Sequence, residues 1–337
     1  MLEVLAGGLQ TTIQDMGRRG GQALGIPASG AQDGFALRIA NLLVGNPHGG
    51  PLILRDNPGS AGLEITLGGL QVRATADLVI ALTGADLGAT VDGAVVPLWS
   101  ALLLRAGQIL TCRIAKSGAR AYLGIHGGID VPLYLGSRAT HLGGKFGGLM
   151  GRPLGVGDRV PVGRATADLG ALVGRRLRPD LVPSYGAPWE VRAIVGPEIH
   201  MFTEESVETF FRTAWKLNPK ADRIGMRYIG PALHFRPGRP HYLIEDAGDN
   251  PSNIVIDPGA PVGTVQVPAG VEPIVLGVDS PSIGGYARIA VVISIDMSRI
   301  GQTRPMEETR FVRISHEDAV ALLAQQEALI AEASIVP

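Results

Sequence analysis

The sequence predicts a mostly β protein, and three observations support this prediction. Glycine and proline are abundant, with 47 and 24 residues in a chain of 337, and only 18% of the residues are charged. Such a balance favours short strands joined by tight turns over long solvated helices. Between residues 63 and 96, short apolar runs are separated by Gly, Asp-Gly and Ala-Asp, the spacing expected of hairpins in a barrel or a sandwich.

Two positions make the strand prediction specific. The Asp92-Gly93 pair is the clearest hairpin turn in the chain, because both residues tolerate a positive φ. In residues 108–115 the apolar side chains lie mainly on one face of an expected strand, and Cys112 is among them. No neighbouring His would activate this thiol, so we interpret Cys112 as a core residue rather than a nucleophile.

Three helices interrupt the strands. From Asp33 to Val44 the apolar residues follow helical spacing, and Gly45 supplies a left-handed position for the end of the helix. A second helix is expected to begin at Thr203 as N-cap, and the last to begin at the capping pattern that starts with Ser315. The last helix is expected to pack on the outside of the fold.

The length of the chain predicts two domains, since 337 residues exceed what one hydrophobic core usually supports. Between residues 165 and 188 the strand periodicity is lost and three prolines and a basic cluster occur. We therefore predict an N-terminal domain over residues 1–165, a linker over 166–188, and a C-terminal domain over 189–337 that includes the last helix.

Charge and composition exclude several classes of partner. The formal net charge is −1 with Lys and Arg scattered along the chain, which argues against binding of nucleic acid or of an anionic membrane. No apolar run is long enough to span a bilayer, and we expect no signal peptide. A single cysteine excludes an intrachain disulfide, so we expect a protein of the cytoplasm.

Common catalytic motifs do not match. The glycine-rich segment from Gly143 to Arg152 lacks the Lys-Ser or Lys-Thr of a nucleotide-binding P-loop, although Lys145 and Arg152 could meet an anion in a closing loop. The seven histidines show no metal-ligand spacing, so we expect no metal site. No nucleophile elbow of the G-x-S-x-G type occurs, which leaves covalent serine catalysis unsupported.

The N-terminal segment from Thr11 to Asp33 is the first candidate site, because it concentrates glycines and charged side chains in one loop. It contains Gln14, Asp15, Arg18 and Ser29, and it delivers Asp33 to the start of the first expected helix. One interpretation is structural: Ser29 or Asp33 caps the helix and an Asp–Arg pair holds the loop. The other is functional: the rigid loop places backbone N–H groups, Asp33 and the nearby Asn41 around a small polar substrate.

A second candidate site lies between residues 222 and 286. Gln266 stands in an otherwise apolar strand, where a buried amide is either a structural tie or a substrate contact. Asp279, Gly284, Gly285 and Tyr286 follow it. Arg223 and Arg227 lie four residues apart, which suits either gripping a substrate carboxylate or pairing with Asp222 and Glu245.

Nine motifs resemble the biotin-dependent carboxyltransferase family, also called allophanate hydrolase subunit 2, and the resemblance runs from about Glu3 to Phe311. They are TTIQDMGRRG, GIPASGAQD, ANLLVGN, LEIT, GGIDVPLYLGSRAT, GRPLGVGD, DRIGMR, GTVQVP and DSPSIGGY. The family includes the C subunit of 5-oxoprolinase and the carboxyltransferase domain of urea carboxylase. The resemblance implies two cyclophilin-like β-barrel domains with a few short helices. Gln32 departs from the family, which usually has Met before Asp33.

The resemblance also implies a function. We expect a hydrolase component of an ATP-dependent complex that opens 5-oxo-L-proline to glutamate. Its expected partners are an allophanate hydrolase subunit 1-like protein, which is similar to the B subunit of 5-oxoprolinase, and a protein similar to the A subunit. Nucleotide binding is then expected at the level of the complex. One alternative is a component that transfers CO₂ from carboxybiotin to urea or a related amide, and another is a non-catalytic regulatory or scaffold protein.

The site residues are taken from the matching motifs, which carry both candidate sites. We expect Asp33 or Asp279 to accept a proton, Gln266 to bind a carbonyl and Tyr286 to orient the substrate. The expected substrate-binding residues are Gln14, Asp15, Arg18, Ser29, Asn41, Arg138, Arg223, Arg227, Gly284 and Gly285.

Overall fold

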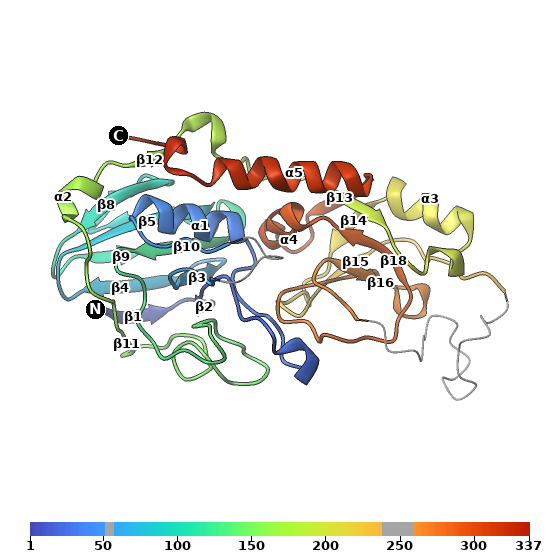
Figure 1. Cartoon of the computed structure of the whole chain (residues 1–337), viewed down its shortest axis with the longest axis horizontal. Coiled ribbons are helices and arrows are strands. Elements are labelled where there is room, and N and C mark those ends of the chain that lie inside the picture. Colours follow the sequence, from blue (N-terminus) through green and yellow to red (C-terminus); the bar gives the residue numbers. More distant parts are fainter. Residues whose placement is uncertain (51–56, 238–258) are drawn as a thin grey trace. The chain divides into compact units, whose positions relative to one another are not determined.

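The computed structural model describes residues 1–50, 57–237 and 259–337, and it confirms the mostly β class with a few short helices. The described residues form two compact units (Figure 1). Unit 1 comprises Met1–Gly20, Ala28–Tyr185 and Gln325–Pro337, and unit 2 comprises Gly21–Pro27 and Gly186–Ala324. The chain thus passes from unit 1 to unit 2 after Tyr185, within the segment predicted as the linker, and the C-terminal residues belong to unit 1.

Unit 1 consists of two sheets that share one core. The six-stranded sheet has the order β11-β1-β4-β9-β6-β7, and the seven-stranded sheet has the order β2-β3-β10-β5-β8-β12-β20. Apolar side chains of both sheets meet in the core, including Leu2, Val72, Leu63 and Leu123. The strands are β1 (Leu2–Gly7), β2 (Gln10–Gln14), β3 (Gly62–Thr66), β4 (Leu70–Ala74), β5 (Leu78–Asp86), β6 (Thr90–Val91), β7 (Ala94–Val95), β8 (Ser100–Leu104), β9 (Ile109–Thr111), β10 (Ser117–Ile125), β11 (Arg159–Val160), β12 (Arg176–Leu177) and β20 (Ile335–Val336).

Helix α1 (Gly34–Leu43) covers the other face of the seven-stranded sheet, and it matches the first predicted helix. The Asp33 carboxylate caps it by accepting a hydrogen bond from the Ala36 backbone N–H at 3.0 Å. The Thr83 hydroxyl of β5 donates to the Ala36 carbonyl at 2.7 Å, which ties the helix to the sheet. Of the apolar residues that follow helical spacing, Ile39, Leu42 and Leu43 are buried and Phe35 is half-buried. Helix α2 (Leu169–Leu172) is a single turn.

Unit 2 is built on a closed barrel of seven strands in the order β13-β18-β16-β17-β15-β14-β19. Its core contains Trp215, Tyr228, Phe210 and Phe311, and the rings of the two phenylalanines stack 4.7 Å apart. The strands are β13 (Trp189–Val195), β14 (Ala214–Leu217), β15 (Gly225–Ile229), β16 (Thr264–Gln266), β17 (Ile274–Leu276), β18 (Arg288–Val292) and β19 (Glu308–Arg313).

The remaining two predicted helices are also confirmed. Helix α3 (Glu204–Arg212) begins after Thr203, whose hydroxyl accepts from the Ser206 N–H, and helix α5 (His316–Leu329) begins after Ser315. Helix α5 buries no residue along its length, as expected for an outer helix. Short elements complete the fold: α4 (Met297–Gln302), η1 (Gln22–Leu24), η2 (Pro179–Leu181), η3 (Ile199–Met201), η5 (Pro268–Gly270), η6 (Ser294–Asp296) and η7 (Glu332–Ser334).

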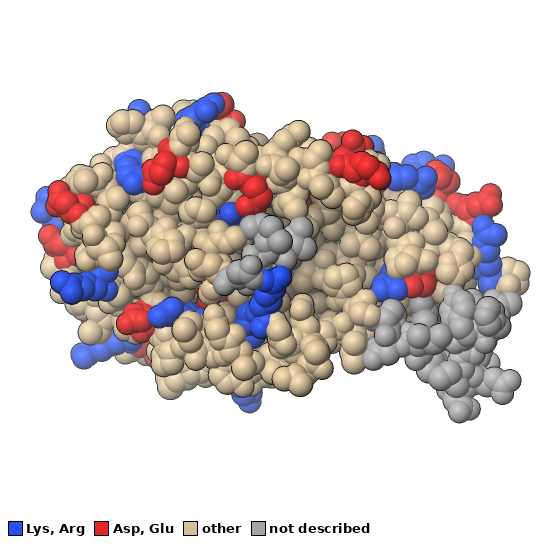
Figure 2. Space-filling model, viewed as in Figure 1, with Lys and Arg blue, Asp and Glu red and all other residues tan. Residues whose placement is uncertain are grey.

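Local predictions from the sequence hold as well. Asp92 and Gly93 both have positive φ, and they join β6 to β7 as a hairpin turn. Cys112 is buried in the core of unit 1, and burial raises the pKa of its thiol to about 12. On the face drawn in Figure 2, basic and acidic side chains are interspersed, without a broad field of one sign. No helix within the described ranges is long and apolar enough to cross a bilayer.

Candidate functional site

In unit 1, two loop segments from the first candidate site run side by side. The Arg18 N–H donates to the Ala28 carbonyl at 2.8 Å, and the Ala31 N–H donates to the Asp15 carbonyl at 2.9 Å. Gly30, with a φ of 95°, lies so close to the backbone of residues 16–17 that a Cβ there would collide with it. The glycine-rich sequence is therefore needed to bring these two segments together.

Asp15 joins the loop to a third segment of unit 1. Its buried carboxylate accepts hydrogen bonds from the Ser137 hydroxyl at 2.7 Å, the Arg138 N–H at 2.6 Å and the Gly17 N–H at 2.7 Å. Burial raises the pKa of Asp15, although these donors and the nearby Arg18 oppose the shift. The contact to Arg138 brings together two residues that the sequence analysis selected from separate motifs. The Arg138 side chain turns toward the Val131 carbonyl and Asp130.

Arg18 and Gln14 are also bound to the segment around residue 140. The Arg18 guanidinium is buried, donates to the Ala139 carbonyl and lies 4.9 Å from the centroid of the Phe146 ring. The Gln14 amide nitrogen donates to the Thr140 carbonyl at 3.1 Å. One cluster in unit 1 thus contains four of the predicted site residues: Gln14, Asp15, Arg18 and Arg138. Their hydrogen bonds join three loop segments of unit 1 to one another.

Asp33 belongs to a neighbouring network that the sequence analysis did not foresee. Its N–H donates to the Tyr122 hydroxyl at 2.8 Å, and the Tyr122 hydroxyl donates to the Glu64 carboxylate at 2.7 Å. Glu64 also accepts from the Gln32 N–H at 2.9 Å. The Tyr185 hydroxyl donates to the Asp33 carboxylate at 3.1 Å. Burial is the largest cause that raises the pKa of both tyrosines, so their hydroxyls keep their protons and act as donors.

Glu64 and Tyr122 carry a signal that a closer reading of the sequence could have used. Thr12, Glu64, Tyr122 and Thr83 stand opposite one another on β2, β3, β10 and β5. They form a buried polar row across the sheet, on the face that α1 covers. A charged residue within a short apolar strand such as LEIT indicates a buried partner, but only the sheet register identifies that partner.

Asn41 lies apart from this cluster, near the C-terminal end of α1. Its amide donates to the Ser60 carbonyl at 2.8 Å, and its side-chain oxygen accepts from Asn46 at 3.0 Å. Asn46 in turn binds the Ile125 carbonyl and the Gly127 N–H. Within unit 1, Asn41 thus ties the end of the helix to the sheet, while Asp33 stands at the other end of the same helix.

In unit 2, Arg223 and Asp279 form a buried ion pair. The guanidinium donates to the carboxylate at 2.8 and 3.2 Å, and both side chains are almost fully buried. Asp222, one suggested partner, caps its own turn by accepting from the N–H groups of Ile224 and Gly225. Glu245, the other suggested partner, lies outside the described residues.

Gln266 and Arg227 share the outer face of the barrel. Arg227, Ile274 and Gln266 stand directly opposite one another on β15, β17 and β16, while Val265 and Val275 point into the core. Gln266 is buried, and its amide nitrogen is close to Gly284, where a Cβ would collide with it. Tyr286, in the same loop as Gly284 and Gly285, is 39% exposed.

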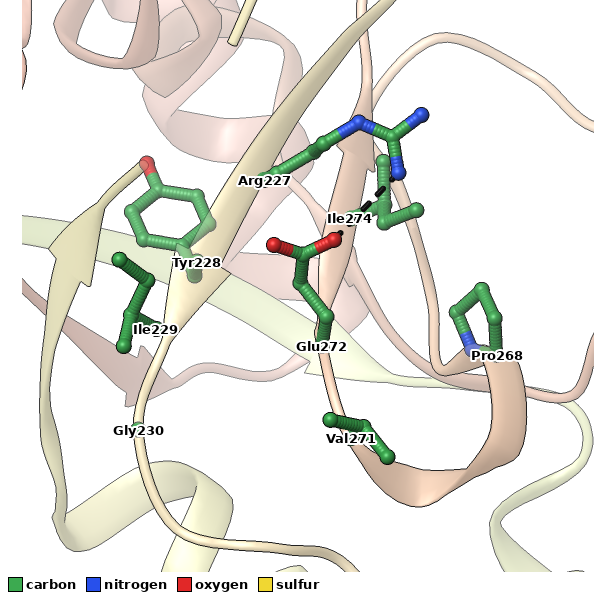
Figure 3. Close-up of a pocket in the computed structure, with 8 residues that line it drawn as sticks. All are labelled: Arg227, Tyr228, Ile229, Gly230, Pro268, Val271, Glu272 and Ile274. Carbon is green, nitrogen blue, oxygen red and sulfur yellow. Dashed lines mark hydrogen bonds and ion pairs between the residues drawn. The ribbon is translucent and has the colours of Figure 1, made fainter. Parts of the chain in front are cut away.

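A surface pocket of about 430 Å³ opens beside this row of residues (Figure 3). Ile274, Pro268, Val271 and Ile229 give it mostly apolar walls. Its polar edge is Arg227, whose guanidinium lies 3.4 Å from the Glu272 carboxylate. Glu272 is therefore an ion-pair partner of Arg227. The Glu272 carboxylate also accepts a hydrogen bond from the Asn218 amide at 2.8 Å.

The segment from Gly143 to Arg152 does not fit a phosphate-binding loop. Arg152 is bound to the Asp158 carboxylate at 2.7 and 2.8 Å. Gly147, Gly148 and Gly151 have positive φ and pack directly on neighbouring chain atoms, so they serve close packing. Among the residues that the structure describes, no cluster of His, Cys, Asp and Glu is arranged to hold a metal ion.

Comparison with known proteins places this fold in a family. The model of the family described as carboxyltransferase domain, subdomain A and B, matches residues 24–313. The chain belongs to this carboxyltransferase-domain family. The resemblance that the nine motifs predict is therefore confirmed.

Proteins that are similar to this chain include 5-oxoprolinase C subunits and urea amidolyases. The chain is 37% identical to the 5-oxoprolinase C subunit of Escherichia coli, over 97% of this chain and 96% of that protein. It is 34% identical to the urea amidolyase of Saccharomyces cerevisiae over 98% of its length, but spans only 17% of that longer protein. The crystal structure of the Kluyveromyces lactis urea amidolyase superposes with a TM-score of 0.87 at 32% identity, over the whole of this chain and 21% of the other.

Proposed function

We propose that this chain is one component of an ATP-dependent 5-oxoprolinase-type complex, which opens 5-oxo-L-proline to glutamate together with an allophanate hydrolase subunit 1-like partner. The observation that carries the proposal is the similarity to the 5-oxoprolinase C subunit of Escherichia coli, which extends over nearly all of both chains at 37% identity. The corresponding C subunit from Haemophilus influenzae is 31% identical over 97% of this chain and 96% of that protein. Because both relatives are named as subunits, we expect partner chains here as well.

Opening a lactam requires donors for the developing oxyanion and a group that takes up or delivers a proton. Gln266 suits the first role, because its amide nitrogen is buried next to Gly284 and has no hydrogen-bond partner among the described residues. Asp33 suits the second role better than Asp279 does. Asp279 is bound on both oxygens by Arg223, while Asp33 accepts from a backbone N–H and from the neutral hydroxyl of Tyr185.

The cluster around Asp15 is better suited to positioning than to chemistry. Gln14, Arg18 and Arg138 use their polar groups to join loops of unit 1, and Asp15 is enclosed by three donors. In this proposal they hold the Ala28–Asp33 loop in a fixed shape, which reduces the entropy lost when a substrate is bound.

A second candidate function is carboxyl transfer to urea or a related amide. It is favoured by the similarity to urea amidolyase and by the superposition on the Kluyveromyces lactis structure. We expect ATP, and for carboxyl transfer also biotin, to act at the level of the complex. A purely regulatory or scaffold protein is the third candidate.

Reconstitution distinguishes the three candidates. The purified chain is mixed with its two expected partners, the allophanate hydrolase subunit 1-like protein and the protein similar to the 5-oxoprolinase A subunit. Glutamate and ADP are measured with 5-oxo-L-proline and ATP as substrates, and we expect glutamate only when this chain is present. Urea consumption that depends on bicarbonate and biotin, without lactam opening, would favour carboxyl transfer.

Variants then separate catalysis from scaffolding. We expect Asp33→Asn and Gln266→Met to reduce turnover while the complex still assembles in size-exclusion chromatography. Asp77→Asn changes an exposed carboxylate of unit 1 and serves as the control. If both site variants turn over at the wild-type rate, this chain acts as a scaffold.

A further inference from the structure

The loop from Ala28 to Asp33 in unit 1 is held rigidly by its backbone. The Ala28 carbonyl accepts from Arg18 at 2.8 Å, and the Ala31 N–H donates to the Asp15 carbonyl at 2.9 Å. The Gln32 N–H donates to the Glu64 carboxylate, and the Asp33 N–H donates to the Tyr122 hydroxyl. Four hydrogen bonds to two strands and a neighbouring loop therefore fix the path of six residues.

Two polar side chains of this rigid loop, Ser29 and Gln32, are buried. The Ser29 hydroxyl and both polar atoms of the Gln32 amide are buried without a hydrogen-bond partner among the described residues. Ser29 is fully buried and Gln32 is 2% exposed. On the adjacent strand β2, the side-chain oxygen of Gln14 is in the same state, although its amide nitrogen is satisfied.

Such a cluster is unusual, because native proteins pair nearly all their buried polar groups. Ser29 also has a φ of 54°, in the left-handed region that a non-glycine residue rarely adopts. Strained backbone and unpaired polar groups concentrate where a ligand completes the hydrogen bonding. Bracing of the loop does not explain both features, because the hydrogen bonds that fix its path use backbone groups and not the side chains of Ser29 and Gln32.

The unpaired atoms define the chemistry of the missing partner. Gln32 offers an N–H donor and a C=O acceptor on one planar group, Ser29 offers a hydroxyl, and Gln14 offers a further acceptor. The carboxylates of Glu64 and Asp33 lie against the same loop, which disfavours an anion. Arg18, whose backbone N–H donates to the Ala28 carbonyl, brings a positive charge to the segment beside the loop, which disfavours a cation. A neutral group with adjacent N–H and C=O edges can satisfy both poles of the Gln32 carboxamide.

We propose that Gln32, with Ser29, binds the N–C=O edge of a neutral amide, such as a lactam or urea. The inference rests on the proposed function, because it assigns a substrate contact for an amide-directed complex. In a lactam or in urea an N–H and the C=O point to the same side, so they can form two parallel hydrogen bonds with the Gln32 carboxamide. Removing one pole of the carboxamide loses one of these bonds, and removing both poles loses both.

The test measures binding to the isolated full chain, which keeps it independent of turnover. The side-chain NH₂ signals of Gln32 are assigned by NMR in the ¹⁵N-labelled protein, and 2-pyrrolidinone or urea is titrated to about 100 mM, enough to detect weak binding. We expect both ligands to shift the Gln32 signals. Cyclopentanone, which has the carbonyl but no N–H, is expected to shift them far less.

Variants test the same contact by substitution. Gln32→Met keeps the side-chain volume and removes both polar atoms, and we expect it to weaken lactam binding at least about tenfold, as for the loss of two neutral hydrogen bonds. Ser29→Ala should weaken binding less. Gln71→Met, at an exposed position on β4, is the matched control and should bind as the wild type does.

Two results would overturn the inference. One is a Gln32 side-chain signal that does not respond to either ligand, a measurement that requires no variant to fold. The other is a Gln32→Met protein that binds lactam like the wild type and melts at a higher temperature. The Gln32 amide would then be an unpaired buried group that lowers stability without binding a ligand. If the Gln32 signals respond but the reconstituted complex does not open lactams, the binding site stands and the proposed function fails.

Discussion

Replacing Tyr122 by Phe tests whether the buried network positions the Ala28–Asp33 loop. Tyr122 is completely buried, and its hydroxyl donates to Glu64 and accepts from the Asp33 N–H. The substitution removes one oxygen and leaves the ring in place, so it creates almost no cavity. A hydrogen bond to a carboxylate contributes about 1.5–3 kcal/mol, and a buried N–H without an acceptor costs about 1–3 kcal/mol. Because both effects arise from one hydroxyl, they are not fully additive, and we expect the opening free energy of unit 1 to fall by about 3 kcal/mol.

Hydrogen exchange is the suitable assay, because it reports the opening free energy of unit 1 residue by residue. We expect the Asp33 amide, which loses its acceptor, to exchange much faster in Tyr122→Phe. Tyr134→Phe removes a hydroxyl from a half-exposed ring and should change the opening free energy by less than about 0.5 kcal/mol. If Tyr122→Phe lowers the opening free energy by less than about 1 kcal/mol and the Asp33 amide is still protected from exchange, the reasoning is refuted.

Three further predictions concern stability. Arg223→Met leaves the buried Asp279 carboxylate without its guanidinium, so it should lower the free energy of unfolding of unit 2, measured in urea, by about 3–5 kcal/mol. Arg227→Met removes one partner of a solvent-exposed ion pair and should lower it by less than about 1 kcal/mol. Equal losses in the two variants would contradict the argument from burial. Gly147→Ala places a Cβ against a backbone carbonyl at a φ of 70° and should lower the melting temperature more than Gly157→Ala, which meets open space at a φ of 85°. The buried Cys112 thiol should resist Ellman's reagent at pH 8 until the protein unfolds. Its pKa in the folded state, about 12, exceeds the ordinary value of 9.0, so the folded state holds this proton more tightly than the unfolded state does. The free energy of unfolding should therefore fall as the pH rises from about 9 to about 12.

Local features of the fold could be predicted from the sequence because short-range chemistry determines them. The Asp33 cap, the apolar stripe of α1 and the Asp92-Gly93 turn each depend on residues within one or two turns of chain. The resemblance of nine motifs gave the family, and the match over residues 24–313 confirms it.

The candidate sites were predictable only in part, because their contacts join residues far apart in the chain. Arg223 and Asp279 are 56 residues apart, and the sequence analysis suggested Asp222 and Glu245, not Asp279, as ion-pair partners. Glu64 and Tyr122 meet only through the register of β3 and β10. Whether a buried Gln such as Gln32 or Gln266 is paired also depends on its surroundings in three dimensions, which periodicity does not report.

The most direct test of the account is the steady-state kinetics of Gln32→Met in the reconstituted complex with 5-oxo-L-proline and ATP. Gln32 is proposed to bind the ground-state amide, so we expect KM for the lactam to rise at least about tenfold with kcat nearly unchanged, while KM for ATP stays at the wild-type value. Wild-type constants for all three parameters would contradict the account, because the loop that carries Gln32 would then take no part in binding the amide.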